Sequence, residues 1–263
     1  MNPALRIPAE FVAPSPEDAH LPPFFEVGSF AFGKHSLLIL LSVVLIAGFF
    51  LYVVRRRAMV PSKGQYLGEM GYGFVRNSLG RDIIGEKDFR PYVPLLFTFF
   101  FFILVNNLFG SIPVLQLPTF SHPGSAYVLA AIAYVVWVAA GIRRHGFGHF
   151  MAKMTMPPGV PKILYIILIP LEFLSNMIIR PVTHALRLFA TMFAGHMAMM
   201  VAAALTAFLA TEVGGVLGIG GSFFGIVLGI FIYFLEVLIQ VLQAYIFTLL
   251  FAVYVQGALQ EGH

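Results

Sequence analysis

The stretch LLILLSVVLIAGFFLYVV, residues 37–54, is almost entirely apolar and carries no charged residue. About 20 apolar residues in a helix cross the hydrocarbon core of a bilayer, so this stretch predicts a transmembrane helix. Arg55, Arg56 and Arg57 follow it directly. Basic residues that flank an apolar segment are typical topology determinants, and we place the first membrane segment at residues 36–55.

The whole chain has the composition of a membrane protein. Of its 263 residues, 59% are hydrophobic and only 11% are charged, whereas soluble proteins carry about 25% charged residues. No cysteine is present, which excludes disulfides and thiolate metal sites. The net charge of +4 does not indicate nucleic-acid binding, because the basic residues flank apolar segments. We expect a polytopic membrane protein with no cofactor, no metal site and no nucleic-acid partner.

Four more apolar segments follow the first, at residues 92–113, 126–142, 163–211 and 223–259. Residues 56–91 are mixed and charged, which is typical of an amphipathic helix lying on the membrane surface. We therefore predict an all-α fold with five transmembrane helices and one surface helix.

The distribution of basic residues predicts the topology. Residues 55–90 contain eight of the sixteen lysines and arginines and residues 143–162 contain four, while the turns at 114–125 and 212–222 contain none. The positive-inside rule places both basic regions in the cytoplasm. We expect the polar segment 1–35 to lie outside and the C-terminus to lie inside.

The last two apolar segments are longer than a bilayer requires. Pro181 to Thr211 would form about 46 Å of helix and Phe223 to Leu259 about 55 Å, while the hydrocarbon core is about 30 Å thick. These helices must break or lie strongly tilted as a hairpin, with the Gly-rich stretch 213–222 separating them. We expect a tilted pair of helices to pack against a partner protein.

Polar side chains recur inside the fourth apolar region at intervals of three or four residues, which predicts a stripe along one helix face. The stripe consists of Glu172, Asn176, Arg180, Thr183 or His184, Arg187 and Thr191. His196 lies nine residues after Arg187, on the opposite side of a helix with 3.6 residues per turn. Polar groups thus occupy two faces, one on each side of Arg187, and Pro181 is a candidate kink.

The last apolar segment carries a second polar set, and small residues precede it on the same side of the helix. The set comprises Glu236, Gln240 and Gln243, with Gly221, Gly225 and Gly229 before it. Glycines four residues apart let helix backbones approach closely in a membrane. We expect this face to pack against the preceding helix, with His196 and Glu236 as neighbours.

Several of these residues have a purely structural alternative. Interhelical hydrogen bonding is the alternative for Asn176, Thr183, Thr191 and Gln240. Arg180 can extend to the cytoplasmic headgroups, and His184 is typical of packing. Arg187 differs, because an arginine near the bilayer centre costs about 2.5–3.5 kcal/mol and no acidic residue lies within several turns of it.

A fixed positive charge at Arg187 would act on ion movement. The guanidinium stays charged and cannot relay a proton, but it favours the ionised form of a carboxyl group brought beside it. If a partner presents a protonated carboxyl group, Arg187 would displace the proton and hold the anion. It would also stop protons from passing directly between the two polar paths.

Four segments carry a resemblance to a known family over roughly residues 90–260. They are LRLFATMFAGH (186–196), LQAYIFTLLFAVY (242–254), LEFLSNMIIRPVTHALRLF (171–189) and NNLFGSIP (106–113). With this order and spacing, the chain resembles subunit a of F-type ATP synthases.

The resemblance implies a stator subunit in a bacterial plasma membrane, without a catalytic site of its own. It implies a rotating c-subunit ring, peripheral stalk b subunits and the rest of the ATP synthase complex as partners. A four-helix membrane domain, residues 92–260, would contain two proton half-channels.

The resemblance also implies residue roles. Arg187 falls on the family's essential arginine. His196 and Glu236 fall on a linked pair in the outer half-channel, and many bacterial members have these two side chains exchanged. Gln243 falls on a glutamine near the arginine, and the family usually has asparagine where this chain has Thr191. Glu172 and Thr183 fall in the half-channel that opens to the cytoplasm. The full set of candidate proton-translocation residues is Glu172, Asn176, Thr183, His184, Arg187, Thr191, His196, Glu236, Gln240 and Gln243.

Three other classes of membrane protein fit the sequence less well. A secondary ion transporter or channel would need internal repeats, which the sequence does not show. An intramembrane enzyme would need a motif such as HExxH or paired aspartates, and neither occurs in the apolar segments. An inert anchor would have no use for Arg187.

Overall fold

The computed structural model describes residues 25–27, 30–55, 61–112, 115, 119–156, 161, 164–213 and 215–260. Within these ranges the chain is mainly helical, with turns between the helices. It also has two short antiparallel strands, β1 (Phe25–Val27) and β2 (Phe30–Phe32), that the sequence did not predict. Most of the predicted N-terminal segment 1–35 lies outside the described residues, as do Arg56 and Arg57.

Among the described residues, five helical stretches are long and apolar enough to cross a membrane, which confirms the predicted polytopic all-α fold. The first three are α1 (Lys34–Arg55), a 3₁₀ turn η3 (Arg90–Tyr92) continued by α4 (Val93–Leu108), and α5 (Pro123–His145). The fourth runs through α7 (Tyr165–Phe173), η6 (Leu174–Ile179), α8 (Arg180–Phe208) and η7 (Leu209–Val213). The fifth is α9 (Gly215–Leu259).

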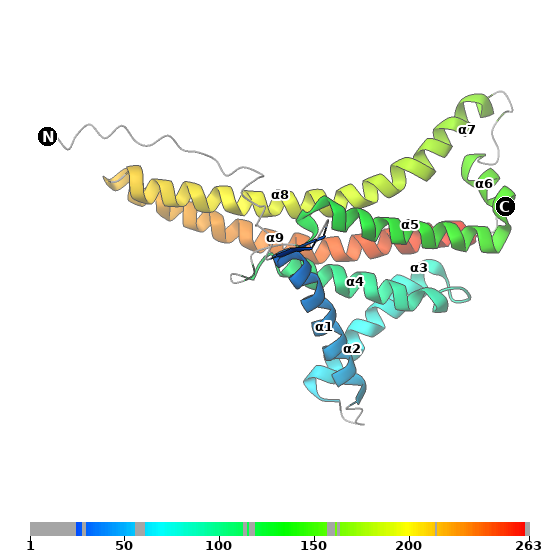
Figure 1. Cartoon of the computed structure of the whole chain (residues 1–263), viewed down its shortest axis with the longest axis horizontal. Helices are drawn as coiled ribbons and strands as arrows, with labels where there is room; N and C mark the ends of the chain where they lie inside the picture. The colour runs from blue at the N-terminus through cyan, green and yellow to red at the C-terminus, as the bar shows by residue number, and fades with distance from the viewer. Residues whose placement is uncertain are drawn as a thin grey trace.

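The charged region between the first two spans is helical, as predicted. It forms α2 (Lys63–Phe74), η2 (Val75–Arg81) and α3 (Asp82–Ile84), and runs from the end of α1 back along α4 (Figure 1). Val75 and Leu79 are fully buried, whereas Tyr66, Leu67 and Met70 are exposed. A further short helix, α6 (Phe147–Thr155), packs against the end of α5.

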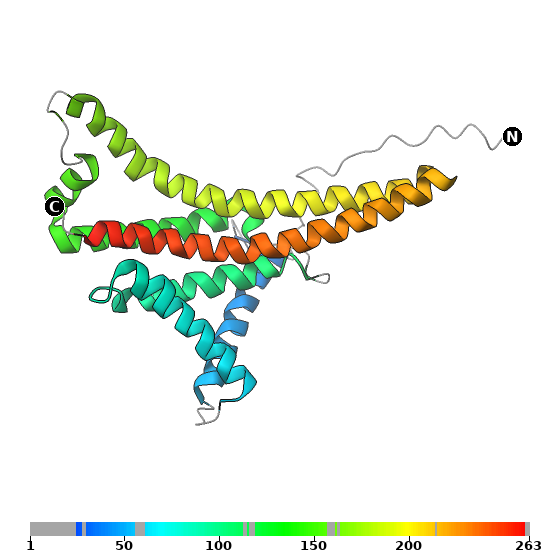
Figure 2. The same ribbon diagram turned by 180° about the vertical axis from the view of Figure 1, so that it is seen from behind.

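Helices α8 and α9 lie side by side and antiparallel in both views (Figures 1 and 2). The C-terminal half of α9 lies between α4 and α5, while the other end of the hairpin extends well beyond them. The fourth and fifth spans contain 49 and 45 residues, about 74 and 68 Å of helix. In Figure 1, α1 makes a steep angle with the axis of the α8–α9 hairpin. If α1 crosses the membrane along its normal, the hairpin must be strongly tilted in the membrane.

Two predicted boundaries were wrong. The second span ends at Leu108 and not at 113, because the chain turns at Gly110 and Ser111 before Pro113, which cannot continue a helix. The predicted separator 213–222 is mostly helical, since α9 begins at Gly215. In a membrane, helix formation satisfies backbone groups that a loop would leave unpaired, so glycine does not end a helix as readily as in water.

The predicted close approach of α9 to the preceding helix is confirmed at Gly225 and is wrong for Gly229. A Cβ atom on Gly218 would lie 2.8 Å from the Leu209 carbonyl oxygen, and one on Gly225 would lie 2.4 Å from the Thr206 hydroxyl. Both distances are shorter than van der Waals contact. A Cβ atom on Gly229 would meet nothing within 4 Å, so the hairpin is closed near its tip and more open at Gly229.

A π-helical turn, η6, precedes the predicted kink at Pro181. The backbone N–H of Arg180 donates to the carbonyl of Ser175, five residues earlier. Proline has no N–H and its ring clashes with a carbonyl in a regular helix, and the wider π turn accommodates it. Helix α7 bends away from α5 beyond this point (Figure 1).

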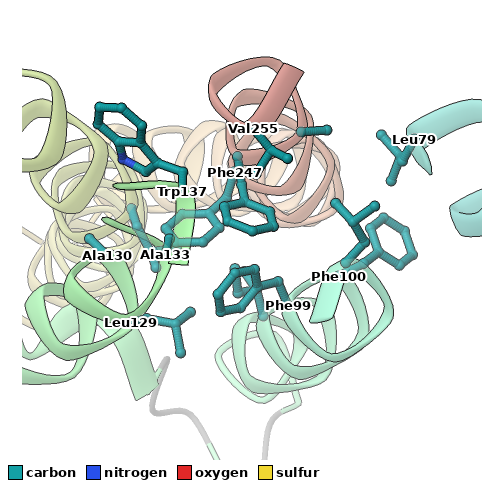
Figure 3. Packing of buried hydrophobic residues seen from close by; sticks show 14 of the residues in the cluster. Leu79, Phe99, Phe100, Leu129, Ala130, Ala133, Trp137, Phe247 and Val255 are labelled. Atoms are coloured by element: carbon teal, nitrogen blue, oxygen red, sulfur yellow. The ribbon is translucent and has the colours of Figure 1, made fainter. Parts of the chain in front are cut away.

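An aromatic core holds α4, α5 and α9 together (Figure 3). The Phe99 ring of α4 meets the rings of Phe247 and Phe251 edge-on, at centroid distances of 5.6 and 5.1 Å. Ala130 and Ala133 on α5 are small and buried, which lets α5 lie close to this cluster. The C-terminal half of α9 is therefore the fixed part of the hairpin.

The contact at Gly225 predicts a stability difference within α9. We expect Gly225→Ala to destabilise the chain by about 1–3 kcal/mol, because the added methyl group overlaps Thr206. Gly229→Ala is the control, since it gains the same helix propensity without a clash. The thermal midpoint of the detergent-solubilised complex measures the difference, and equal midpoints for the two variants would contradict the close contact.

Candidate ion path along the hairpin

A buried polar cluster joins the end of α4 to the middle of α9. The Gln240 side-chain amide donates to Glu236 Oε1 at 3.2 Å, and Gln240 Oε1 accepts from the Ser111 hydroxyl at 2.7 Å. Asn107 Nδ2 also donates to the Gln240 backbone carbonyl, at 3.3 Å. Glu236 is 3% exposed and Gln240 is fully buried. The sequence had indicated Glu236 and Gln240, but not Asn107 or Ser111.

Glu236 of α9 packs directly against α8, at the helical turn of α8 that contains His196. A Cβ atom added to Gly195 would lie 3.3 Å from Glu236 Cγ. Within the described chain, the carboxyl group and the imidazole form no ion pair within 4.0 Å. Glu236 Oε2 and His196 Nδ1 are buried without a hydrogen-bond partner among the described residues. Each side chain thus keeps a free polar atom for a water or a proton.

A cavity of about 660 Å³ lies between α8 and α9. His196, Thr206, Ser222 and Tyr233 contribute polar groups to its lining. Gly110, which precedes Ser111, also lines it. The cavity is large enough for several water molecules, since one water needs about 10–15 Å³.

Arg187 faces away from the helix bundle. Its side chain is exposed, and within the described ranges it has neither a carboxylate within 4.0 Å nor a hydrogen-bond partner. The exposed face of α8 continues through Ala190 and Ala194 in one direction and Thr183 in the other. Small residues on this face leave room for a helix of another chain to approach.

Thr183 and His184, which the sequence had left as alternatives for the polar stripe, point to different sides of α8. Thr183 shares the exposed face with Arg187, and its hydroxyl donates to the Ile179 carbonyl at 2.8 Å. His184 is 4% exposed and its ring packs on Phe247 at a centroid distance of 3.9 Å. Neither ring nitrogen of His184 has a hydrogen-bond partner in the described part of the chain.

Two further candidates are Thr191, one helical turn after Arg187 on α8, and Gln243, on the buried side of α9. The Thr191 hydroxyl donates to the Arg187 carbonyl at 2.7 Å, so it bonds to its own helix. Gln243 is 3% exposed, and its side-chain nitrogen lacks a hydrogen-bond partner among the described residues. An unpaired amide in this position can donate to a water or to a group that another subunit supplies.

A second polar group lies toward the start of the fourth span. Asn176 Nδ2 donates to Glu172 Oε2 at 3.0 Å and to the Met154 carbonyl at 2.6 Å. Asn176 is buried, whereas Glu172 is partly exposed. The Arg180 guanidinium lies over the Tyr254 ring, 5.5 Å from its centroid. The Glu172–Asn176 pair therefore lies on the other side of Arg187 from His196 and Glu236.

A polytopic helical chain is typical of an ion-translocating membrane protein when polar groups lie on both sides of an exposed arginine that has no carboxylate partner among the described residues. The family model described as ATP synthase A chain matches residues 36–256. The chain is 51% identical to ATP synthase subunit a of Pseudarthrobacter chlorophenolicus over 97% of both chains. It is 47% identical to that of Nocardioides sp., over 96% of this chain and 95% of the relative, and 41% identical to that of Streptomyces lividans, over 88% and 81%.

The chain therefore belongs to the ATP synthase A chain family. It is a multi-pass membrane subunit of the proton-translocating sector of an F-type ATP synthase. Membership in this family agrees with the resemblance found in the sequence.

Proposed function

We propose that the chain is the stator subunit that conducts protons past a rotating ring of c subunits. Two half-channels would deliver protons to a ring carboxylate and remove them from it, and Arg187 would separate the half-channels. The observation that carries this proposal is the exposed Arg187 side chain, which has no carboxylate partner in the described part of the chain.

An unpaired guanidinium in a membrane is costly, so a carboxylate from a partner is its natural counter-ion. Proximity to Arg187 would favour the ionised carboxylate and thus release of its proton. Because arginine keeps its own proton, it would hold the anion without passing the proton on. Ala190 and Ala194 on the same face are small and exposed, which would leave room for a ring helix to approach the guanidinium.

The outer half-channel would use the cavity between α8 and α9. Protons would enter past His196, reach Glu236 and pass to the ring near Gln243. An imidazole and a carboxyl group suit this task because both can take up and release protons. Gln240 would hold Glu236 in place, since its amide donates to the carboxyl group.

The inner half-channel would use Glu172, Asn176 and Thr183. Asn176 orients the Glu172 carboxylate through a direct hydrogen bond. Thr183 lies one helical turn from Arg187 on the same exposed face, where the ring carboxylate would pass. Thr191 would steady the backbone at Arg187, and His184, which lies inside the bundle, would pack rather than carry protons.

The basic regions support a topology with the N-terminus outside and the C-terminus in the cytoplasm of a bacterial cell, in its plasma membrane. The c-subunit ring would lie against the exposed face of the tilted hairpin. The peripheral stalk b subunits would hold the chain against rotation. ATP would be made or hydrolysed in another sector of the complex.

The role of Arg187 is tested by substituting it alone. We expect Arg187→Ala to abolish ATP-driven proton pumping in inverted membrane vesicles while the complex still assembles, because the exposed side chain forms no hydrogen bond or ion pair with the described part of the chain. Arg180→Ala is the control, since Arg180 lies two turns away and packs over Tyr254. It should keep at least half of the native rate. Native pumping by Arg187→Ala would contradict the proposal.

The two histidines of α8 predict opposite outcomes for the same substitution. His184→Phe should keep at least half of the native pumping rate, because a phenyl ring fills the same space and removes unpaired buried nitrogens. His196→Phe should lower the rate at least tenfold, because it removes the imidazole from the cavity. Pumping rates normalised to assembled complex decide the matter, and the reverse order would overturn these assignments.

A further inference from the structure

We infer that Ser111 is a positioning residue for the proton path: its hydroxyl orients the Gln240 amide, which in turn holds the Glu236 carboxyl group. The inference rests on the proposed function, in which Glu236 lies in the outer half-channel. Ser111 lies in the turn after α4, within the NNLFGSIP motif (106–113), and the sequence had not indicated it as a site residue.

Two hydrogen bonds in series connect the three side chains. Ser111 Oγ lies 2.7 Å from Gln240 Oε1, and Gln240 Nε2 lies 3.2 Å from Glu236 Oε1. All three residues are buried, with exposures of 7%, 0% and 3%. In a dry environment such bonds are strong and hold their partners in one arrangement.

The Ser111 hydroxyl fixes which end of the Gln240 amide meets Glu236. Because the amide oxygen accepts from the hydroxyl, the amide nitrogen is turned toward the carboxyl group. Nitrogen can only donate, so it binds one oxygen, Oε1, of Glu236. The other oxygen, Oε2, stays buried with no hydrogen-bond partner in the described chain. Oε2 is therefore the atom at which Glu236 takes up and releases the proton.

Without the Ser111 hydroxyl, the Gln240 amide is free to turn over. Its carbonyl oxygen would then face Glu236 and accept a hydrogen bond from the protonated carboxyl group. That bond would hold the proton on Glu236 and slow its transfer to the ring. The helices themselves would stay together, because Asn107 donates to the Gln240 backbone carbonyl independently of Ser111.

Ser42 provides a matched control for a buried serine of the same chain. Its side chain is fully buried, donates to the Ile39 carbonyl at 2.7 Å and accepts from Asn106 at 2.8 Å. It thus joins α1 to α4 and contacts none of the three residues of the proposed relay. Loss of its hydroxyl costs packing and hydrogen bonding without touching Gln240.

The first test compares pumping rates per assembled complex in inverted vesicles. Ser111→Ala should lower the rate about threefold to tenfold, the effect of losing one buried hydrogen bond. Ser111→Thr retains a hydroxyl and should restore at least half of the native rate, and Ser42→Ala should stay near native. A native rate for Ser111→Ala, or equal losses for Ser111→Ala and Ser111→Thr, would overturn the inference.

The second test asks whether Ser111 acts through Gln240. In a Gln240→Met background, Ser111→Ala should cause no further loss of pumping, because the amide that Ser111 orients is gone. If the two losses of pumping multiply, the two residues act independently, which would contradict the inference.

Glu236→Gln distinguishes a failure of the proposed function from a failure of the role of Ser111. If Glu236→Gln pumps normally, the proposed function itself fails; if it abolishes pumping while Ser111→Ala is native, only the role of Ser111 fails.

Discussion

The charge on Arg187 constrains the rest of this structure. A guanidinium cannot lose its charge, and the described chain offers it no carboxylate. The charge therefore needs solvation by water or an anionic group from another molecule. Helix α8 meets this requirement by burying Ala185 and Leu188 against the bundle, which leaves Arg187 on the opposite, exposed face. The direction of one side chain thus follows from the packing of its neighbours.

Helix α9 joins a rigid half to a polar half. Its C-terminal half carries Phe247 and Phe251 in the aromatic core, while the half before Glu236 borders the cavity and packs on α8 through glycines. The buried polar residues lie where the two halves meet. A proton carrier at this junction would have a packed core on one side and a cavity on the other, which is the arrangement that the proposed relay needs.

The sequence predicted the five spans, the excess length of the last two and their glycine-mediated contact, because these depend on local composition and spacing. Three features could not be predicted. The Ser111–Gln240 contact joins residues far apart in the chain, and only the packing of α4 on α9 brings them together. The π turn η6 shifts the helical register, so regular spacing could not decide between Thr183 and His184. The start of α9 at Gly215 reflects the membrane and the neighbouring helix rather than glycine's weak helix propensity.

Passive proton conduction tests most directly whether Arg187 separates two paths. Vesicles that contain the intact complex would be given a membrane potential without nucleotide, so that no catalytic turnover drives the ring. The account predicts that the native complex conducts little and that Arg187→Ala conducts protons measurably faster, because protons can then pass between the half-channels without being carried around the ring. Equal, low conduction in both would contradict the account, since the arginine would then not be the barrier.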